Sequence, residues 1–191
     1  YGINPLNIES EQIQVSGLVV REQCPTPSHW ASEMTLSDYL KSADIPGISN
    51  VDTRAITRKI RSEGVMLGAI VSSGKKPSAK EILKSCPDYG VTDFVSKVSN
   101  PNISKYNEPK DKNYHIGVID MGVKYNILRI LKENNCEITV LPAITSLAEI
   151  ESLNLDGVMF SPGPGNPELL DYLVHTTKGL IGKVPIFGIC L

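Results

Sequence analysis

Two short stretches near the end of the sequence contain the residues best suited to chemistry. The stretch "PIFGICL" ends the sequence and carries Cys190 after an apolar run, and "SPGPGNP" at 161–167 alternates glycine with proline. A cysteine can attack an acyl carbon as a nucleophile, and glycines let backbone N–H groups approach a developing oxyanion closely. We therefore take an acyl-transfer site as the first hypothesis.

The spacing around Cys190 is typical of a nucleophile turn. The usual pattern is G-x-nucleophile-x-G between a strand and a helix, because the sharp turn needs small neighbours. Gly188, Ile189, Cys190 and Leu191 supply four of those five positions. The alternative is that Cys190 is a small core residue, since free cysteine is among the most buried residue types. The 161–167 stretch has its own alternative, a loop shaped only by the needs of a turn.

The elements that position these residues alternate along the second half of the chain. Apolar runs predict strands over 114–120, 136–142, 156–163 and 184–190, and helical spacing follows the first of them over 123–134. Strands that alternate with helices indicate a parallel sheet covered on both faces, whose ligands gather at the carboxyl ends of the strands. Asp120, the 161–167 loop and Cys190 all fall at that edge.

Capping signals place the other two helices of this half. Ser146 and Glu149 form a capping box at the start of a short helix, and Asn166 with Pro167 opens a longer one. Asp120 also follows a strand, and a turn-capping role is favoured for it over a catalytic one.

The first half is predicted to be an α+β domain with its own small core. Strands are expected over 13–22 and 66–73, and a short helix over 35–43. The clearest element is a helix at 51–64, capped by Asp52 and closed by Gly64. The polar stretch at 99–113 reads as a linker, which gives domains at 1–98 and 114–191.

Composition limits the function classes. The chain has 191 residues and a formal net charge of −2, which gives no electrostatic case for nucleic acid. No apolar run is long enough to span a membrane, and the start lacks the pattern of a signal peptide. The four cysteines lack C-x-x-C spacing and the three histidines are scattered, so neither a zinc site nor a disulfide framework is expected. Free cysteines favour a reducing compartment, the cytoplasm.

The two chemical stretches together resemble the glutaminase domain of class I, triad-type glutamine amidotransferases. Four further stretches are similar to the small subunits of carbamoyl phosphate synthases: "YGIN" with "SGLVVRE", "PSHWASEMTLSDYL", "IPGISNVDTRAITRKIRSEG" and "IDMGVKYNILRIL". The N-terminal stretches are absent from other amidotransferases. The resemblance implies an N-terminal small-subunit domain followed by the first half of a parallel-sheet glutaminase domain.

The resemblance also implies a function and a partner. Such a subunit hydrolyses L-glutamine and passes ammonia to a large synthetase subunit, which makes carbamoyl phosphate for pyrimidine and arginine synthesis. ATP and magnesium would belong to that large subunit, so no cofactor or metal is expected in this chain. The alternatives are the glutaminase component of another amidotransferase, or a non-catalytic binding module in which Cys190 is structural.

Residue by residue, the resemblance assigns Cys190 as the nucleophile. Gly163 and Gly165 match the glycines that line the glutamine and oxyanion site, and Leu191 matches the position whose backbone N–H completes the oxyanion hole. The family's triad also needs an H-x-E pair downstream of the cysteine, which these residues lack. We therefore expect a fragment truncated at both ends, with no meaningful glutaminase activity alone.

Two further features are open to interpretation. Arg54, Arg58 and Arg61 follow one stripe of the 51–64 helix; a solvated face is favoured over a docking surface for the large subunit. Trp30, the only tryptophan, is predicted to be a core anchor.

Overall fold

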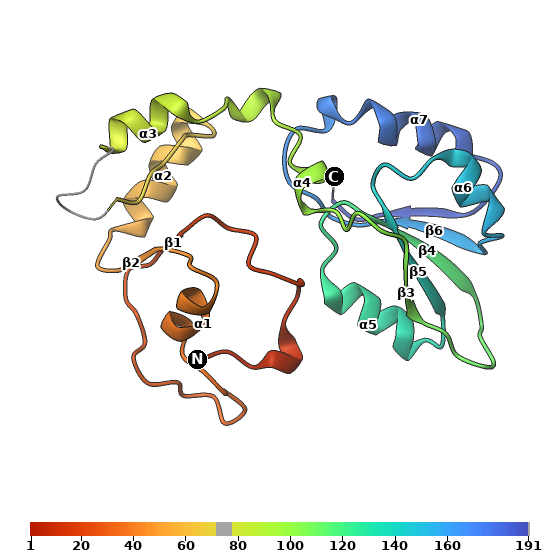
Figure 1. The fold of residues 1–191 in the computed structure, drawn as a ribbon, viewed down its shortest axis with the longest axis horizontal. Coiled ribbons are helices and arrows are strands. Elements are labelled where there is room, and N and C mark those ends of the chain that lie inside the picture. The colour runs from red at the N-terminus through yellow and green to blue at the C-terminus, as the bar shows by residue number, and fades with distance from the viewer. Residues whose placement is uncertain (72–77, 191) are drawn as a thin grey trace. The chain divides into compact units, whose positions relative to one another are not determined.

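The computed structural model describes residues 1–71 and 78–190. The chain divides into two compact units, Tyr1–Tyr89 and Gly90–Leu191, and Figure 1 labels most of their helices and strands. Within the described residues, every helix is too short or too polar to cross a bilayer.

The second unit is built on one five-stranded sheet in the order β3-β5-β4-β6-β7. Strands β4 to β7 are parallel, which confirms the parallel sheet predicted from the alternation of strands and helices. Each predicted strand is present with shorter ends. The bounds are β3 Ser104–Asn107, β4 His115–Asp120, β5 Glu137–Pro142, β6 Gly157–Phe160 and β7 Ile186–Gly188.

Helices cover both faces of this sheet, as Figure 1 shows. Helix α5 (Tyr125–Glu133) lies on one face, while α6 (Leu147–Ser152) and α7 (Asp171–Leu180) lie on the other. Alternate strand residues point to the two faces, so the core consists of two apolar clusters. One cluster joins the strands to α6 and α7 through Ile119, Leu141, Ile150, Phe160, Leu173 and Leu180. The other joins them to α5 through Val118, Leu128, Ile138, Val140 and Met159.

The predicted capping signals of this half are present. Ser146 and Glu149 exchange both hydrogen bonds of the capping box at α6. The Asn166 side chain accepts from the N–H of Glu168 and opens a 3-10 turn, η3 (Pro167–Leu169). Leu170 then leaves helical geometry, with φ −106° and ψ 44°, before α7 begins. The single long helix expected after Asn166 is therefore a short turn followed by a helix.

The stretch expected to be a linker contributes to the sheet instead. Strand β3 pairs antiparallel with β5, as Ser104 and Lys105 face Val140 and Thr139. Its sequence, "SKYN", is short and polar, so it lacks the apolar alternation by which strands are recognised. Residues 90–98 also belong to the second unit and carry the short helix α4 (Val95–Val98).

The first unit has less regular structure than expected. Its elements, within the described residues, are two parallel two-residue strands and three short α-helices. A 3-10 turn precedes them, and another follows them at the unit boundary. In chain order they are η1 Pro5–Asn7, β1 Leu18–Val19, α1 Leu36–Ser42, β2 Gly47–Ile48, α2 Thr53–Glu63, α3 Ala79–Ser85 and η2 Tyr89–Val91.

The helix predicted at 51–64 is confirmed, with both of its caps. The Asp52 side chain accepts from the N–H of Ala55, and Gly64 ends the helix with φ 86°. The strand predicted over 13–22 contracts to Leu18–Val19. The strand predicted over 66–73 is wrong for the described residues 66–71, which form no ladder; residues 72 and 73 lie outside the described part of the chain.

The small core expected in the first unit is not present in its described residues, none of which is buried. Trp30 is 92% exposed and stacks on His29 with ring centroids 5.7 Å apart, so its assignment as a core anchor is wrong. The apolar residues Ile56 and Ile60 of α2 are also exposed. The physical reason is that two-residue strands offer no sheet face on which helices could bury an apolar stripe.

Candidate active site

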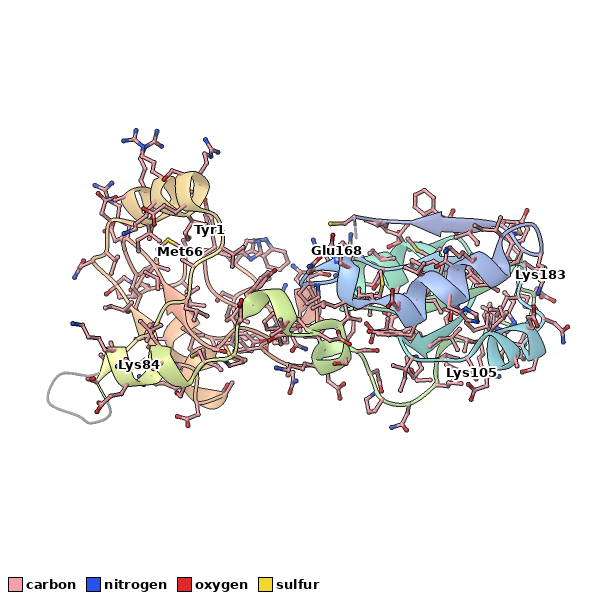
Figure 2. All side chains as sticks on the ribbon, turned by 90° about the horizontal axis from the view of Figure 1, so that it is seen from above. Tyr1, Met66, Lys84, Lys105, Glu168 and Lys183 are labelled. Carbon is pink, nitrogen blue, oxygen red and sulfur yellow. The ribbon has the colours of Figure 1, made fainter. Side chains whose placement is uncertain are left out.

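The two stretches that predicted chemistry begin at the same edge of the sheet. Strands β6 and β7 are parallel neighbours, with Phe160 opposite Gly188. The N–H of Ile189 donates to the carbonyl of Phe160 at 3.1 Å, which extends the pairing one residue further. The loop that follows β6 and the thiol that follows β7 therefore leave the carboxyl ends of adjacent strands. In Figure 2, Glu168 of η3 marks this end of the unit and Lys183, before β7, marks the opposite end.

Cys190 has the backbone expected of a nucleophile turn. Its φ is 73°, in the left-handed region that few non-glycine residues occupy. Holding a cysteine there costs about 1–3 kcal/mol, a strain found mostly at functional sites. In the described residues the Cys190 side chain is exposed and its thiol is free. A strained, exposed thiol at the carboxyl end of a parallel strand can act as a nucleophile toward a bound acyl group.

Glycine is required at two positions of the loop after β6. A Cβ built on Gly163 would lie 2.6 Å from the carbonyl oxygen of Met121, which is closer than van der Waals contact allows. Gly165 has φ 98°, a conformation that residues with a Cβ rarely adopt. These glycines therefore serve the shape of the loop, because Met121 occupies the space that a side chain would take at Gly163, and Phe94 occupies it at Gly165.

A buried serine joins this loop to the turn after β4. Ser161 is fully buried, and its hydroxyl accepts from the N–H of Met121 at 2.9 Å and donates to the carbonyl of Pro162 at 3.0 Å. Its own N–H donates to the carbonyl of Ile119 at 3.1 Å. Sequence reasoning did not select Ser161 as a site residue. Its position at the end of an apolar strand is a signal that could have identified it.

Asp120 caps the turn after β4. One carboxylate oxygen accepts from the N–H groups of Gly122 and Val123, at 2.9 and 2.8 Å. The other accepts from the N–H of Asn100 at 2.9 Å. Both oxygens are thus engaged by backbone, as the predicted turn-capping role requires.

An apolar cleft of about 350 Å³ opens on the α7 face of the sheet. Gly188 and Phe160, the last residues of β7 and β6, lie in its wall beside Met121. Its other lining residues come from η3, α7 and β7, and they are Pro167, Leu170, Leu173, Val174, Thr177, Lys178 and Ile186.

His115 is not placed to act on Cys190, because it begins β4 at the amino edge of the sheet. Its Nε2 lies 2.8 Å from the hydroxyl of Thr139 and 3.7 Å from a carboxylate oxygen of Glu137. Burial lowers the pKa of His115, against the opposing effect of the Glu137 charge. Glu137 also pairs with Lys112, and that hydrogen bond is the main cause that lowers the pKa of its carboxyl.

Leu191, the predicted oxyanion-hole donor, lies outside the described residues. Over residues 1–71 and 78–190, the His, Cys, Asp and Glu side chains form no cluster that could hold a metal ion.

Sequence reasoning missed the segment that precedes the sheet. Val95 of α4 is fully buried in the core cluster beneath α6 and α7. The hydroxyl of Tyr172, on α7, donates to a carboxylate oxygen of Asp93 at 3.1 Å. Burial and this hydrogen bond raise the pKa of Tyr172 to about 12, so its hydroxyl remains a donor at neutral pH. A local signal for this segment is present in the sequence. Asp93 lies three residues before Ser96, the spacing at which a carboxylate caps a helix by accepting from a backbone N–H.

Comparison with known families gives two matches, one within each unit of the fold. Residues 1–70 match the family described as "Carbamoyl-phosphate synthase small chain, CPSase domain", and residues 117–191 match "Glutamine amidotransferase class-I". The first match lies within the first unit and the second within the second unit.

Curated relatives resemble the whole chain. The carbamoyl phosphate synthase small chain of Syntrophotalea carbinolica is 41% identical, and that of Methanopyrus kandleri is 42% identical; each comparison covers all of this chain and 54% of the relative. The chloroplastic small chain of Arabidopsis thaliana is 38% identical over all of this chain and 47% of its own length. This chain spans about half the length of these relatives, and over that length it is similar to carbamoyl phosphate synthase small chains, with a match to their CPSase domain followed by a match to the class I glutamine amidotransferases.

Proposed function

We propose that this chain forms part of a glutamine-hydrolysing subunit in which Cys190 is the nucleophile. The observation that carries the proposal is the position of Cys190: an exposed thiol with φ 73° leaves β7 beside the glycine-containing loop that leaves β6. The names of the relatives and the match to class I glutamine amidotransferases give the substrate class, a carboxamide.

In the proposed reaction the Cys190 sulfur attacks the γ-carbonyl carbon of glutamine. The tetrahedral intermediate collapses as the C–N bond breaks, and the leaving nitrogen takes a proton and departs as ammonia. The product on the protein is a γ-glutamyl thioester. Water then attacks the thioester carbon, glutamate leaves, and the thiol is restored.

The loop after β6 is proposed to bind the substrate and the oxyanion. Gly163 permits the close approach to Met121, and Gly165 permits a positive φ; in the resulting loop shape, backbone N–H groups are proposed to face the ligand. Such donors stabilise charge that develops on the carbonyl oxygen in the transition state. The N–H of Leu191 is the remaining proposed donor.

The proposed partner is a synthetase subunit that consumes the ammonia. The match of residues 1–70 to the carbamoyl-phosphate synthase domain supports this, and it favours that enzyme over other amidotransferases. The cytoplasm is the proposed location, on the ground that all four cysteines are free thiols.

The proposal is tested by glutamine hydrolysis in the natural full-length protein with its synthetase partner. Cys190→Ser is expected to lower kcat for glutamine at least about a thousandfold, since a nucleophile is lost. Use of free ammonia by the partner is expected to be unchanged. Cys24→Ser, at another exposed free thiol, is the matched control and is expected to retain full activity. Full glutamine-dependent activity of the Cys190→Ser protein would reject the assignment.

A further inference from the structure

The described residues before the sheet make several contacts to the turns that carry the candidate site. The segment Gly90–Asn100 lies outside both family matches, which cover 1–70 and 117–191. It nevertheless belongs to the second unit. Its residues touch the loop after β6, the turn after β4 and helix α7, as the following contacts show.

Phe94 is the contact to the glycine-containing loop. A Cβ built on Gly165 would lie 3.4 Å from Cδ2 and 3.6 Å from Cβ of Phe94. The aromatic side chain therefore packs directly against the face of Gly165 that has no side chain. Gly165 is the loop residue with φ 98°, a conformation that residues with a Cβ rarely adopt. Phe94 therefore covers the loop backbone at that position.

The residues on either side hold Phe94 in place. Asp93 accepts from the hydroxyl of Tyr172 at 3.1 Å and, through its other oxygen, from the N–H of Ser96 at 3.0 Å. Val95 is fully buried in the core. The Phe94 ring thus stands between Asp93, which accepts two hydrogen bonds, and the buried Val95. It therefore has little freedom to withdraw from the loop.

The same segment also contacts the turns that follow β4 and β5. The N–H of Asn100 donates to Asp120 at 2.9 Å, and the hydroxyl of Ser99 accepts from the N–H of Ala143 at 2.9 Å. A Cβ built on Gly122 would lie 3.2 Å from Cγ2 of Val98. The segment is thus fixed at both ends relative to the carboxyl edge of the sheet.

We infer that Gly90–Asn100 is a positioning element of the glutamine site, in which Phe94 holds Gly165 in its left-handed conformation and the Asp93–Tyr172 hydrogen bond holds Phe94. This inference rests on the proposed function, because it assigns the loop after β6 to the binding of glutamine. Phe94 acts through Gly165 and is a positioning residue rather than a catalytic one.

The test uses the natural full-length protein and two readouts. Phe94→Ala is expected to raise KM for glutamine about tenfold while kcat falls less, because a misplaced binding loop weakens substrate capture. Phe94→Leu, which refills the space, is expected to restore most of the affinity. Tyr172→Phe removes one hydroxyl and is expected to raise KM by a smaller factor. Tyr106→Phe, on strand β3 at the other edge of the sheet, is the matched control and is expected to leave KM unchanged.

The second readout does not depend on activity. Amide hydrogen exchange at Gly163, Gly165 and Asn166 is expected to accelerate in Phe94→Ala, while exchange in β5 stays the same. Unchanged exchange in the loop would overturn the inference whatever the chemistry of the site. Faster exchange with an unchanged KM would show that the loop is held by Phe94 but does not bind glutamine. A parent protein without glutaminase activity would reject the proposed function itself, and the role given to Phe94 with it.

Discussion

At the scale of single residues, Ser161 shows how tightly the site edge is connected. Its hydroxyl is fully buried and links the N–H of Met121 to the carbonyl of Pro162. A buried N–H without an acceptor is costly, because its hydration is lost and not replaced.

Ser161→Ala is therefore expected to lower the free energy of unfolding by about 1–3 kcal/mol, since it leaves the Met121 N–H unsatisfied. Urea unfolding of the second unit, followed by circular dichroism, measures the change. Ser152→Ala is the matched control: this exposed hydroxyl donates to the carbonyl of Glu149 within α6, and its loss is expected to cost about 0.5 kcal/mol or less. Equal stability of the two variants would contradict the account of Ser161.

Gly163 gives a steric prediction. Gly163→Ala places a Cβ 2.6 Å from the Met121 carbonyl oxygen, so the loop or the turn must move. We expect a loss of about 1–3 kcal/mol in stability, as for other overpacked sites, together with a clear fall in kcat/KM for glutamine. Gly68→Ala is the control, because a Cβ there meets nothing within 4 Å. A Gly163→Ala protein with the parent's stability and kinetics would show that the close approach to Met121 is unimportant.

His115 gives a prediction about pH. Its pKa is lowered in the folded state, chiefly by burial, and the facing charged groups are Glu137, Lys112, Asp156 and Lys105. A lowered pKa means that the unfolded chain binds more protons, so this contribution to stability is complete above the ordinary histidine pKa of 6.5 and is lost as the pH falls below it. Urea midpoints between pH 8 and about pH 5 measure the loss, since His titrates across this range.

His115→Gln is expected to flatten the pH dependence in that window. A slope that persists in His115→Gln would assign the effect to other groups.

The site residues divide into those with a sequence motif and those without one. Cys190, Gly163 and Gly165 stand in recognisable spacings, because the nucleophile turn and the loop each demand glycine at fixed offsets. Phe94 stands in no such spacing, and Asp93 stands only in a helix-capping spacing with Ser96. Their role depends on packing between segments separated by up to 79 positions, which spacing along the chain does not reveal.

At the scale of elements, prediction succeeded where a local physical signal was strong. The capping box at Ser146, the cap at Asp52 and the four parallel strands all rest on side chains or patterns within a few residues. It failed for β3 and, in the described residues 66–71, for the strand expected over 66–73. The first is polar yet paired, and the second is apolar yet unpaired, since pairing depends on a distant partner rather than on the segment itself.

Two helices of similar length provide a test of this difference. Helix α5 packs on the sheet through the buried Leu128, whereas no residue of α2 is buried. Because packing supplies most of the stability of a protein helix, α2 amides are expected to exchange with solvent at least about a hundredfold faster than α5 amides. Native-state hydrogen exchange with residue resolution measures both in one experiment. Equal protection of the two helices would contradict the burial described for the first unit.

At the scale of the whole molecule, each of the two units has its own family match. Structure and sequence both describe the second unit, whereas sequence is the main evidence for the first. The second unit has a sheet, a core and a candidate site at the carboxyl edge of its strands, where ligands gather in parallel sheets. The first unit matches the CPSase domain of carbamoyl phosphate synthase small chains by its sequence. Its described residues form no buried core. The family could thus be recognised from motifs in both halves, while the support of the site by residues 90–100 required the structure.

The most direct test of the central claim is the covalent intermediate on Cys190. The natural full-length protein would be mixed with glutamine, quenched in acid within milliseconds to seconds, digested and analysed by mass spectrometry. The account predicts one γ-glutamyl group on the peptide that contains Cys190, and none when Cys190 is replaced by serine and quenched in the same way. Glutamine consumption with no adduct at Cys190, or with an adduct on another cysteine, would contradict it.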